Sequence, residues 1–176
     1  AVIGAVEAKH LHQLIADRIE AGTYAIAAAV TGGELLLKYV NPQYIQAPIQ
    51  YLRRSNVEVI ENADSILVRA PDKVVPLDLQ TQPFPHFPTD LQSPMLALLC
   101  KADGVSSIEE TIFESRFMHV PELNRMGANI QIKGNLAVIR GKCEFKGAPV
   151  MATDLRASVA LILAGLAAEE GEETMV

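Results

Sequence analysis

The sequence lacks most of the features that mark disulfide-bonded, metal-binding and membrane-spanning proteins. It contains only two cysteines, Cys100 and Cys143, with no CxxC spacing, so we expect both to be inert thiols of the core. No metal-ligand constellation is apparent, and neither a metal nor a cofactor is expected. The longest apolar run, residues 157–168, is shorter than the roughly 20 residues that cross a bilayer.

Basic residues are also too few for a nucleic-acid or anionic-membrane surface. The chain carries 15 Lys and Arg against 21 Asp and Glu, which gives a net charge of −6 and a pI of about 5.2. We therefore expect neither nucleic acid nor membrane as a partner, and any anionic ligand must be held by a few placed arginines. The N-terminal residues show no signal-peptide pattern, so residues 1–16 are interpreted as the tail of a preceding segment and the predicted location is cytoplasmic.

What the sequence does contain is the composition of a folded domain and a recurring tripeptide. Hydrophobic residues make up 49% and charged residues 20% of the chain, which indicates one folded domain over residues 17–176. Thr89-Asp90-Leu91 recurs as Thr153-Asp154-Leu155, each time before a short apolar segment. The two aspartates either cap helix starts or form a pair of ionised carboxylates that face one cleft. The internal repeat and the arginines Arg116 and Arg156 favour the second alternative.

The chain passes twice through the same order of elements: an apolar helix, a strand, an amphipathic helix and a hairpin. Both apolar helices are predicted to be buried, because apolar residues occupy nearly every side. Gly134-Asn135 is a strong signal for the second hairpin turn. A third pass begins at Thr153 and contains only a helix over residues 157–168. The predicted segments are 24–30, 34–40, 48–54, 57–60 and 65–69, then 91–100, 106–113, 121–126, 130–133 and 136–139.

These patterns predict an α+β domain in which buried central helices are wrapped by outer sheets. The helix entrances Glu20, Asp90 and Asp154 are expected to point toward one end of the domain. The linker over residues 71–88 carries five prolines and is predicted to be a surface loop. The repeats are predicted at about 17–70, 88–141 and 150–176, the third incomplete.

Three motifs carry a resemblance to a known family. They are Phe87-Pro-Thr-Asp-Leu-Gln92, Glu110-Thr-Ile-Phe-Glu-Ser-Arg-Phe-Met-His-Val-Pro-Glu-Leu123 and Met151-Ala-Thr-Asp-Leu-Arg-Ala-Ser158. From about residue 17 to 176 the sequence resembles the enolpyruvyl transferases, and among them the UDP-N-acetylglucosamine 1-carboxyvinyltransferases. The resemblance implies an inside-out α/β barrel of βαβαββ units, with two such domains in the family and substrates bound between them. It also implies that this chain is most of one domain, truncated in its third unit, and inactive alone.

The activity implied by the resemblance is transfer of the enolpyruvyl group from phosphoenolpyruvate to the 3-hydroxyl of UDP-N-acetylglucosamine. This is the first committed step of peptidoglycan synthesis, and so of cell-wall biogenesis, cell shape and cell division. Asp90 matches the family's candidate base, which would take the proton of the attacking hydroxyl. Ile112 and Phe113 match positions that line the UDP-sugar site. For Ile112, a buried strand position is the alternative interpretation.

The resemblance also assigns roles to two arginines. Arg116 and Arg156 are expected near the carboxylate and phosphate of the second substrate, because a guanidinium pairs bidentately with such groups. Asp154 is expected to orient Arg156 or to assist proton transfer. Where the family usually has Asn before the matched arginine, this chain has Ser115. His119 is interpreted as a structural residue at a helix start.

The sequence also allows two interpretations other than an active enzyme. A non-catalytic clamp-like repeat protein and an inactive family member are the alternatives to the enzyme. Within the enzyme reading, the missing domain of the same enzyme or a second copy of the chain is expected to cover the incomplete third unit. Asp17 and Arg18 are interpreted as a hinge or salt-bridge element rather than part of the site.

Overall fold

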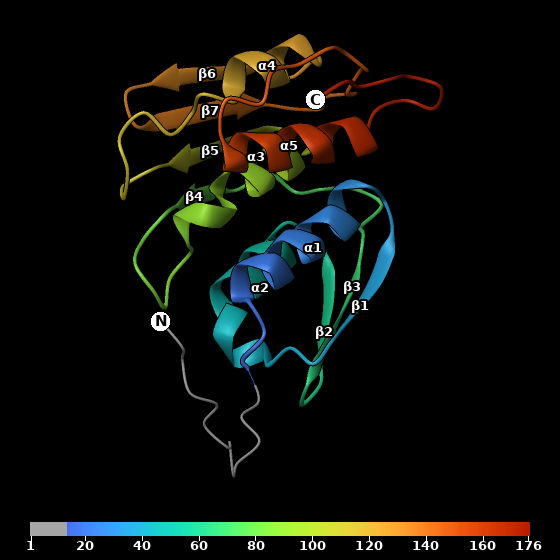
Figure 1. Ribbon diagram of the computed structural model, residues 1–176, viewed down its shortest axis with the longest axis vertical. Coiled ribbons are helices and arrows are strands. Elements are labelled where there is room, and N and C mark those ends of the chain that lie inside the picture. Colours follow the sequence, from blue (N-terminus) through green and yellow to red (C-terminus); the bar gives the residue numbers. More distant parts are fainter. Residues whose placement is uncertain (1–13) are drawn as a thin grey trace, which may run out of the picture.

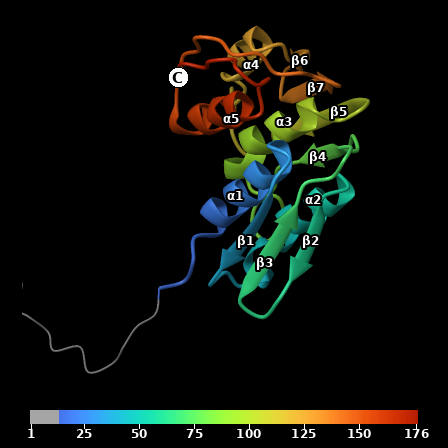
Figure 2. The same cartoon turned by 90° about the vertical axis from the view of Figure 1, so that its right-hand side faces the viewer.

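The computed structural model describes residues 14–176, so most of the predicted tail over residues 1–16 lies outside the described residues. Helices α1 (Arg18–Val30), α3 (Gln92–Cys100) and α5 (Leu155–Leu166) pack against one another in the middle of the molecule. One β-sheet lies on either side of this helical layer (Figures 1 and 2). The predicted α+β class, with central helices and outer sheets, is confirmed.

Helix α3 is the most deeply buried element. All nine of its residues are buried, as expected for a helix that is apolar on every side. It follows directly from a short 3-10 helix, η2 (Thr89–Leu91), which holds the first Thr-Asp-Leu segment.

Helix α1 begins six residues before the predicted segment over residues 24–30. The carboxylate of Asp17 caps it by accepting from the backbone N–H groups of Ile19 and Glu20, so Glu20 lies in the first turn and is not the helix entrance. The helix ends at Thr31, and Gly32 follows with φ of +76°, the left-handed conformation that favours glycine.

The first sheet contains β1 (Glu34–Lys38), β2 (Glu58–Glu61) and β3 (Ser65–Arg69) in the order β1-β3-β2, with antiparallel neighbours. The predicted strand and hairpin are confirmed. Between them lie η1 (Pro42–Ile45) and α2 (Gln46–Arg54), so the amphipathic helix starts two residues before Pro48.

The second sheet contains β4 (Asp78–Gln80), β5 (Val105–Glu109), β6 (Ile130–Lys133) and β7 (Leu136–Arg140) in the order β4-β5-β7-β6. Helix α4 (Val120–Arg125) lies between β5 and β6 in sequence. The hairpin turn is confirmed at Gly134, whose φ is +62°. Strand β5 ends four residues earlier than predicted, so Ile112 and Phe113 lie in the following loop.

The prediction that the linker over residues 71–88 is a surface loop was wrong. Strand β4 lies inside it and pairs in parallel with β5, and Leu77, Leu79 and Phe87 are buried. The prolines flank this short strand and do not interrupt its backbone hydrogen bonds. Cys100 and Cys143 are both free and buried, as predicted.

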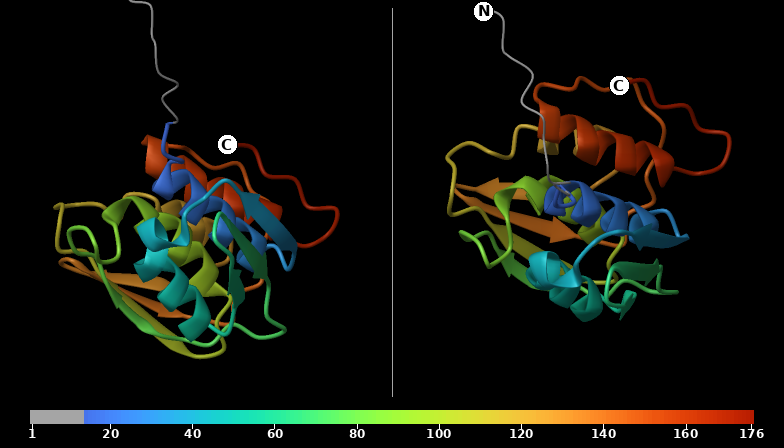
Figure 3. Two further views of the ribbon diagram at one scale, coloured as in Figure 1. Left: turned by 90° about the horizontal axis from the view of Figure 1, so that it is seen from below. Right: turned by 60° about the horizontal axis from the view of Figure 1, so that its bottom comes forward.

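The two sheets share one arrangement, because β1-β3-β2 and β5-β7-β6 have the same order and the same antiparallel pairing. Helix α5 differs from α3 in leaving Leu155, Ile162 and Leu166 exposed. The views in Figure 3 show α5 at the edge of the helical layer. Among the described residues, no helix has the length and hydropathy needed to cross a membrane.

Candidate functional site at the starts of the central helices

The two Thr-Asp-Leu segments fold differently, although their sequences are the same. Asp154 is a helix cap: its Oδ1 accepts from the backbone N–H groups of Arg156 and Ala157, both at 2.8 Å. Asp90 lies within η2 and caps nothing, because Pro88 occupies the N-cap position there. The capping interpretation therefore holds for Asp154 and is wrong for Asp90, whose carboxylate is free for other contacts.

Asp90 is the centre of a cluster with two arginines. Nε and Nη2 of Arg156 both contact Oδ1 of Asp90, and Nη2 of Arg116 lies 3.5 Å from the same oxygen. The side chains are 29% (Asp90), 15% (Arg116) and 45% (Arg156) exposed, so the cluster is half-buried. Within residues 14–176, no hydrogen bond reaches Oδ2 of Asp90. The geometry brings Asp90, Arg116 and Arg156 together and leaves one carboxylate oxygen of Asp90 open.

Helix α5 brings Arg156 to Asp90. The Asp154 cap fixes the first turn of the helix, and the hydroxyl of Ser93 in α3 donates to the backbone carbonyl of Arg156 at 2.9 Å. Asp154 thus contacts Arg156 at its backbone N–H. The two backbone hydrogen bonds, chiefly the one from Ala157, hold the pKa of Asp154 below its ordinary value, so this carboxylate stays ionised and is a weaker base.

Arg116 reaches Asp90 from the loop after β5. Its guanidinium lies over the ring of Phe113, with Cζ 4.5 Å from the ring centroid. Ser115, immediately before it, has φ of +53°, a conformation that Asn and Gly adopt far more readily than Ser. The replacement of the family's Asn by Ser115 therefore matters for the backbone conformation just before Arg116. The ring of Phe113 also holds the Arg116 guanidinium in place.

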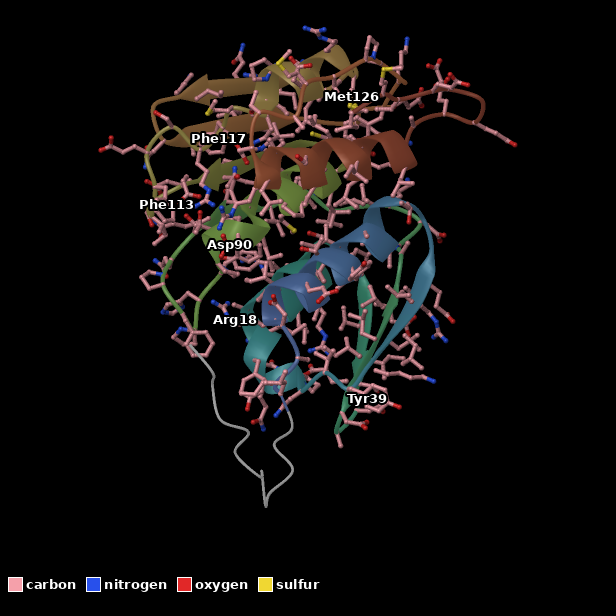
Figure 4. All side chains as sticks on the ribbon, in the orientation of Figure 1. Arg18, Tyr39, Asp90, Phe113, Phe117 and Met126 are labelled. Atoms are coloured by element: carbon pink, nitrogen blue, oxygen red, sulfur yellow. The ribbon has the colours of Figure 1, made fainter. Side chains whose placement is uncertain are left out.

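Ile112 and Phe113 lie on the surface beside this cluster. Ile112 and Phe113 are both exposed and lie beyond the end of β5, so the interpretation of Ile112 as a buried strand residue was wrong. Figure 4 shows Phe113 and Asp90 on the same side of the molecule, where η2 and the loop after β5 approach each other. An apolar and an aromatic side chain next to a carboxylate and two guanidinium groups can contact the apolar and the anionic parts of one ligand.

A buried acid that the sequence interpretation did not single out lies beneath this loop. Glu110 is 2% exposed and accepts from the backbone N–H groups of Ile112 and Phe113. It also accepts from the hydroxyl groups of Thr81 and Thr89. Glu110 continues the buried side of β5, on which Ser106 and Ile108 lie, whereas the neighbouring Glu109 is half-buried.

His119 occupies the N-cap position of α4, so its interpretation as a helix-start residue agrees with its place, although its side chain makes no capping hydrogen bond. It is 2% exposed, and its Nε2 has no hydrogen-bond partner in the described part of the chain. Burial lowers the pKa of His119 to about 4, an effect opposed by Asp154 and reinforced by Arg116. The ring is therefore neutral at pH 7. The residues from 14 onward contain no group of three potential metal ligands.

Asp17 and Arg18 take structural roles, but not through a salt bridge. Asp17 caps α1, and the guanidinium of Arg18 lies 5.3 Å from the ring centroid of Phe84. The hinge interpretation has no observation that tests it.

A cavity of about 310 Å³ lies at the opposite end of the helical layer. Its lining includes the residues that end the three central helices, Thr31, Lys101 and Ala167. Helix C-termini carry partial negative charge and free carbonyl groups, which oppose anion binding. Lys73, Lys101 and Lys142 also line this cavity, together with Asp72 and Asp103, but the arginine pair that suits a carboxylate or phosphate lies at the helix starts, in the Asp90 cluster.

Comparison with known proteins agrees with the resemblance read from the three motifs. A UDP-N-acetylglucosamine 1-carboxyvinyltransferase of Gluconacetobacter diazotrophicus is 53% identical over 168 residues, which make up 94% of this chain and 40% of the relative. One of Dinoroseobacter shibae is 55% identical over 159 residues, 90% of this chain and 38% of the relative. The chain thus spans about 40% of the length of the curated relatives that it matches.

Solved structures show the same fold. The enolpyruvyl transferase NikO from Streptomyces tendae superposes with a TM-score of 0.79 at 28% identity, over 88% of this chain and 37% of that one. An EPSP synthase from Acinetobacter baumannii gives a TM-score of 0.67 at 16% identity, over 90% and 38%. The clamp-like alternative receives no support from these likenesses. A family model described as EPSP synthase (3-phosphoshikimate 1-carboxyvinyltransferase) matches residues 1–176, and the chain therefore belongs to this enolpyruvyl transferase family.

Proposed function

We propose that this chain supplies the sugar-side half of an enolpyruvyl transfer site. In this proposal the 3-hydroxyl of UDP-N-acetylglucosamine attacks C2 of phosphoenolpyruvate while C3 gains a proton. Loss of a proton from C3 and departure of phosphate then leave the enolpyruvyl ether. The names of the curated relatives support UDP-N-acetylglucosamine as the acceptor and a carboxyvinyl group as the group transferred, and the family resemblance supplies phosphoenolpyruvate as the donor.

The observation that carries the proposal is the open Oδ2 of Asp90. Asp90 is held in place through Oδ1 by Arg116 and Arg156, while Oδ2 has no partner among the described residues. Both contacts are ion pairs of the Asp90 carboxylate, and a carboxylate oxygen can accept a proton. A general base in this position contributes about 10²–10⁴-fold to a rate. We assign Asp90 this role toward the sugar hydroxyl.

The remaining site residues bind or orient in this proposal. Arg116 and Arg156 attract the carboxylate and phosphate of phosphoenolpyruvate, since each guanidinium keeps donors that Asp90 does not use. Ile112 and Phe113 contact the UDP-sugar from the exposed loop. Asp154 acts by capping α5 and so orienting Arg156, and its lowered pKa makes it the weaker candidate for proton transfer.

The repeat organisation and the cellular setting are parts of the same proposal. The shared strand order of the two sheets supports repeat units at about 17–70 and 88–141, with a further unit beginning near 150. We propose a cytoplasmic role in peptidoglycan synthesis, and a partner surface, from the rest of the enzyme or from a second copy, over the exposed side of α5.

The test uses a chimera, defined here as the Gluconacetobacter diazotrophicus relative with its matched segment replaced by this chain. We expect the chimera to release phosphate from phosphoenolpyruvate only when UDP-N-acetylglucosamine is present, at a rate typical of enzymes, about 1–10³ s⁻¹. The isolated chain is expected to release none. A chimera that unfolds cooperatively, and is thus folded, but neither turns over nor binds the UDP-sugar by calorimetry would refute the proposal. Turnover by the isolated chain would refute its assignment to half of a site.

A further inference from the structure

Glu110 is a buried carboxylate that no positive charge neutralises among the described residues. It is 2% exposed and forms no ion pair in the part of the chain that the structure covers. Hydrogen bonds alone must then compensate for its burial, since a buried charge without partners is very costly.

Four donors supply that compensation. Oε1 accepts from Thr81 Oγ1 at 2.9 Å, Ile112 N at 2.9 Å and Phe113 N at 3.2 Å, and Oε2 accepts from Thr89 Oγ1 at 2.8 Å. The donors come from three separate segments: the end of β4, the start of η2 and the loop after β5. A carboxylate has about four acceptor positions, two on each oxygen, so the three donors at Oε1 saturate that oxygen while Oε2 keeps one position.

These contacts close a ring of interactions around the site. The hydroxyl of Thr89 donates a hydrogen bond to Glu110. The next residue, Asp90, forms an ion pair with Arg116. The guanidinium of Arg116 lies over the ring of Phe113, and the backbone N–H of Phe113 donates to Glu110. The backbone of Glu110 is itself fixed, because its N–H donates to the carbonyl of Asn135 in the β6–β7 turn at 2.8 Å.

We infer that Glu110 is a positioning residue for Asp90. It sets the distance between Asp90 and the loop that carries Ile112, Phe113 and Arg116, and it acts through the hydroxyl of Thr89 and the two loop amides. The inference rests on the proposed function for the role of Asp90. What matters in it is the reach and the acceptor geometry of residue 110, and not its charge.

Two substitutions of Glu110 separate geometry from charge. Glu110→Gln keeps the length and one acceptor oxygen for the loop amides, and its amide can donate to the Thr89 hydroxyl in place of accepting. Glu110→Asp keeps the charge but is one methylene too short to hold η2 and the loop together. In the chimera, we expect Glu110→Asp to lower kcat by about 10- to 100-fold, since a displacement of about 1 Å can cost 100-fold. Glu110→Gln is expected to retain most of the turnover.

Two further variants test the path through Thr89. Thr89→Val removes the hydroxyl at nearly constant volume and is expected to lower kcat as Glu110→Asp does, whereas Thr89→Ser restores the hydroxyl and most of the turnover. The matched control is Ser106→Ala, which removes a buried hydrogen bond to Leu77 N in the same sheet and should leave kcat unchanged. If Glu110→Gln abolishes turnover while Glu110→Asp keeps it, charge is what matters and the inference is overturned. Normal turnover in both Glu110→Asp and Thr89→Val overturns it as well.

A measurement without turnover separates this inference from the proposed function. In the isolated chain, hydrogen exchange followed by NMR reports whether hydrogen bonds protect the backbone N–H groups of Ile112 and Phe113 from exchange. We expect exchange at both to speed up at least about tenfold in Glu110→Asp and to stay near the original rate in Glu110→Gln, because opening of a local hydrogen bond governs exchange. Unchanged exchange in Glu110→Asp would refute the ring of contacts even if the chimera is active. An inactive chimera with the expected exchange pattern would refute the proposed function and leave the ring in place.

Discussion

Acidification should destabilise this protein through His119, at a higher pH than the range in which Asp154 takes up a proton. The pKa of His119 is lowered from its ordinary value of 6.5 to about 4 by burial. Between these two pH values the unfolded chain binds a proton that the folded chain does not, so the free energy of unfolding falls as the pH decreases. At 1.36 kcal/mol per pKa unit, the full effect is roughly 3 kcal/mol, and it is complete below about pH 4.

Urea unfolding of the chain at pH 8, 7, 6 and 5, followed by circular dichroism, measures this effect. The matched variant is His119→Gln, which keeps a polar side chain but has no group that titrates. From pH 7 to pH 5 the free energy of unfolding of His119→Gln should fall less than that of the original chain. The difference between the two falls should be about 2 kcal/mol. Asp154, whose pKa lies below its ordinary value of 3.8, adds its loss only at lower pH. Parallel stability profiles of the two proteins over this range would refute the burial argument.

Three further predictions follow from individual side chains. Asp154→Ala should cost about 0.5–2 kcal/mol of stability and Asp154→Asn almost nothing, because Asn caps a helix nearly as well as Asp; an equal loss in both by urea unfolding would contradict the capping role. Ser115→Asn should raise the thermal unfolding midpoint, because Asn tolerates φ of +53° better than Ser, and a lower midpoint would contradict this. The exposed side of α5 should make the isolated chain self-associate in analytical ultracentrifugation, with Ile162→Lys and Leu166→Lys reducing it; a monomer at all concentrations would count against that surface.

The sequence predicted those parts of the fold that local patterns determine. Helix α3 is apolar on every side, and Gly134 requires a turn, so their place could be read from the chain itself. Strand β4 was missed because five prolines in the linker outweighed the short alternation around Leu77 and Leu79. That strand depends on its partner β5, which lies about 25 residues away along the chain.

The roles of the site residues depend on tertiary contacts that the sequence does not show. Asp90 and Asp154 stand in identical tripeptides, yet only Asp154 caps a helix, since Pro88 already occupies the N-cap position before Asp90. The family resemblance placed Arg116 and Arg156 near the carboxylate and phosphate of the second substrate, and their pairing with Asp90 was not predicted, because spacing along the chain does not show it. The alternation of β5 places Glu110 on the buried side with Ile108, but the hydroxyl groups of Thr81 and Thr89 that compensate for its burial come from other segments, which no local pattern indicates.

The most direct test of the central claim is the turnover of Asp90→Asn in the chimera, measured together with its binding of UDP-N-acetylglucosamine. Asn keeps the size of the side chain and an oxygen for the arginines but cannot accept the hydroxyl proton. Stability should change by less than about 1 kcal/mol, because Asp90 caps nothing and its ion pairs are half-exposed. The account predicts that kcat falls by about 100-fold or more while the UDP-sugar still binds. Turnover near that of the unsubstituted chimera would contradict the assignment of Asp90 as the base.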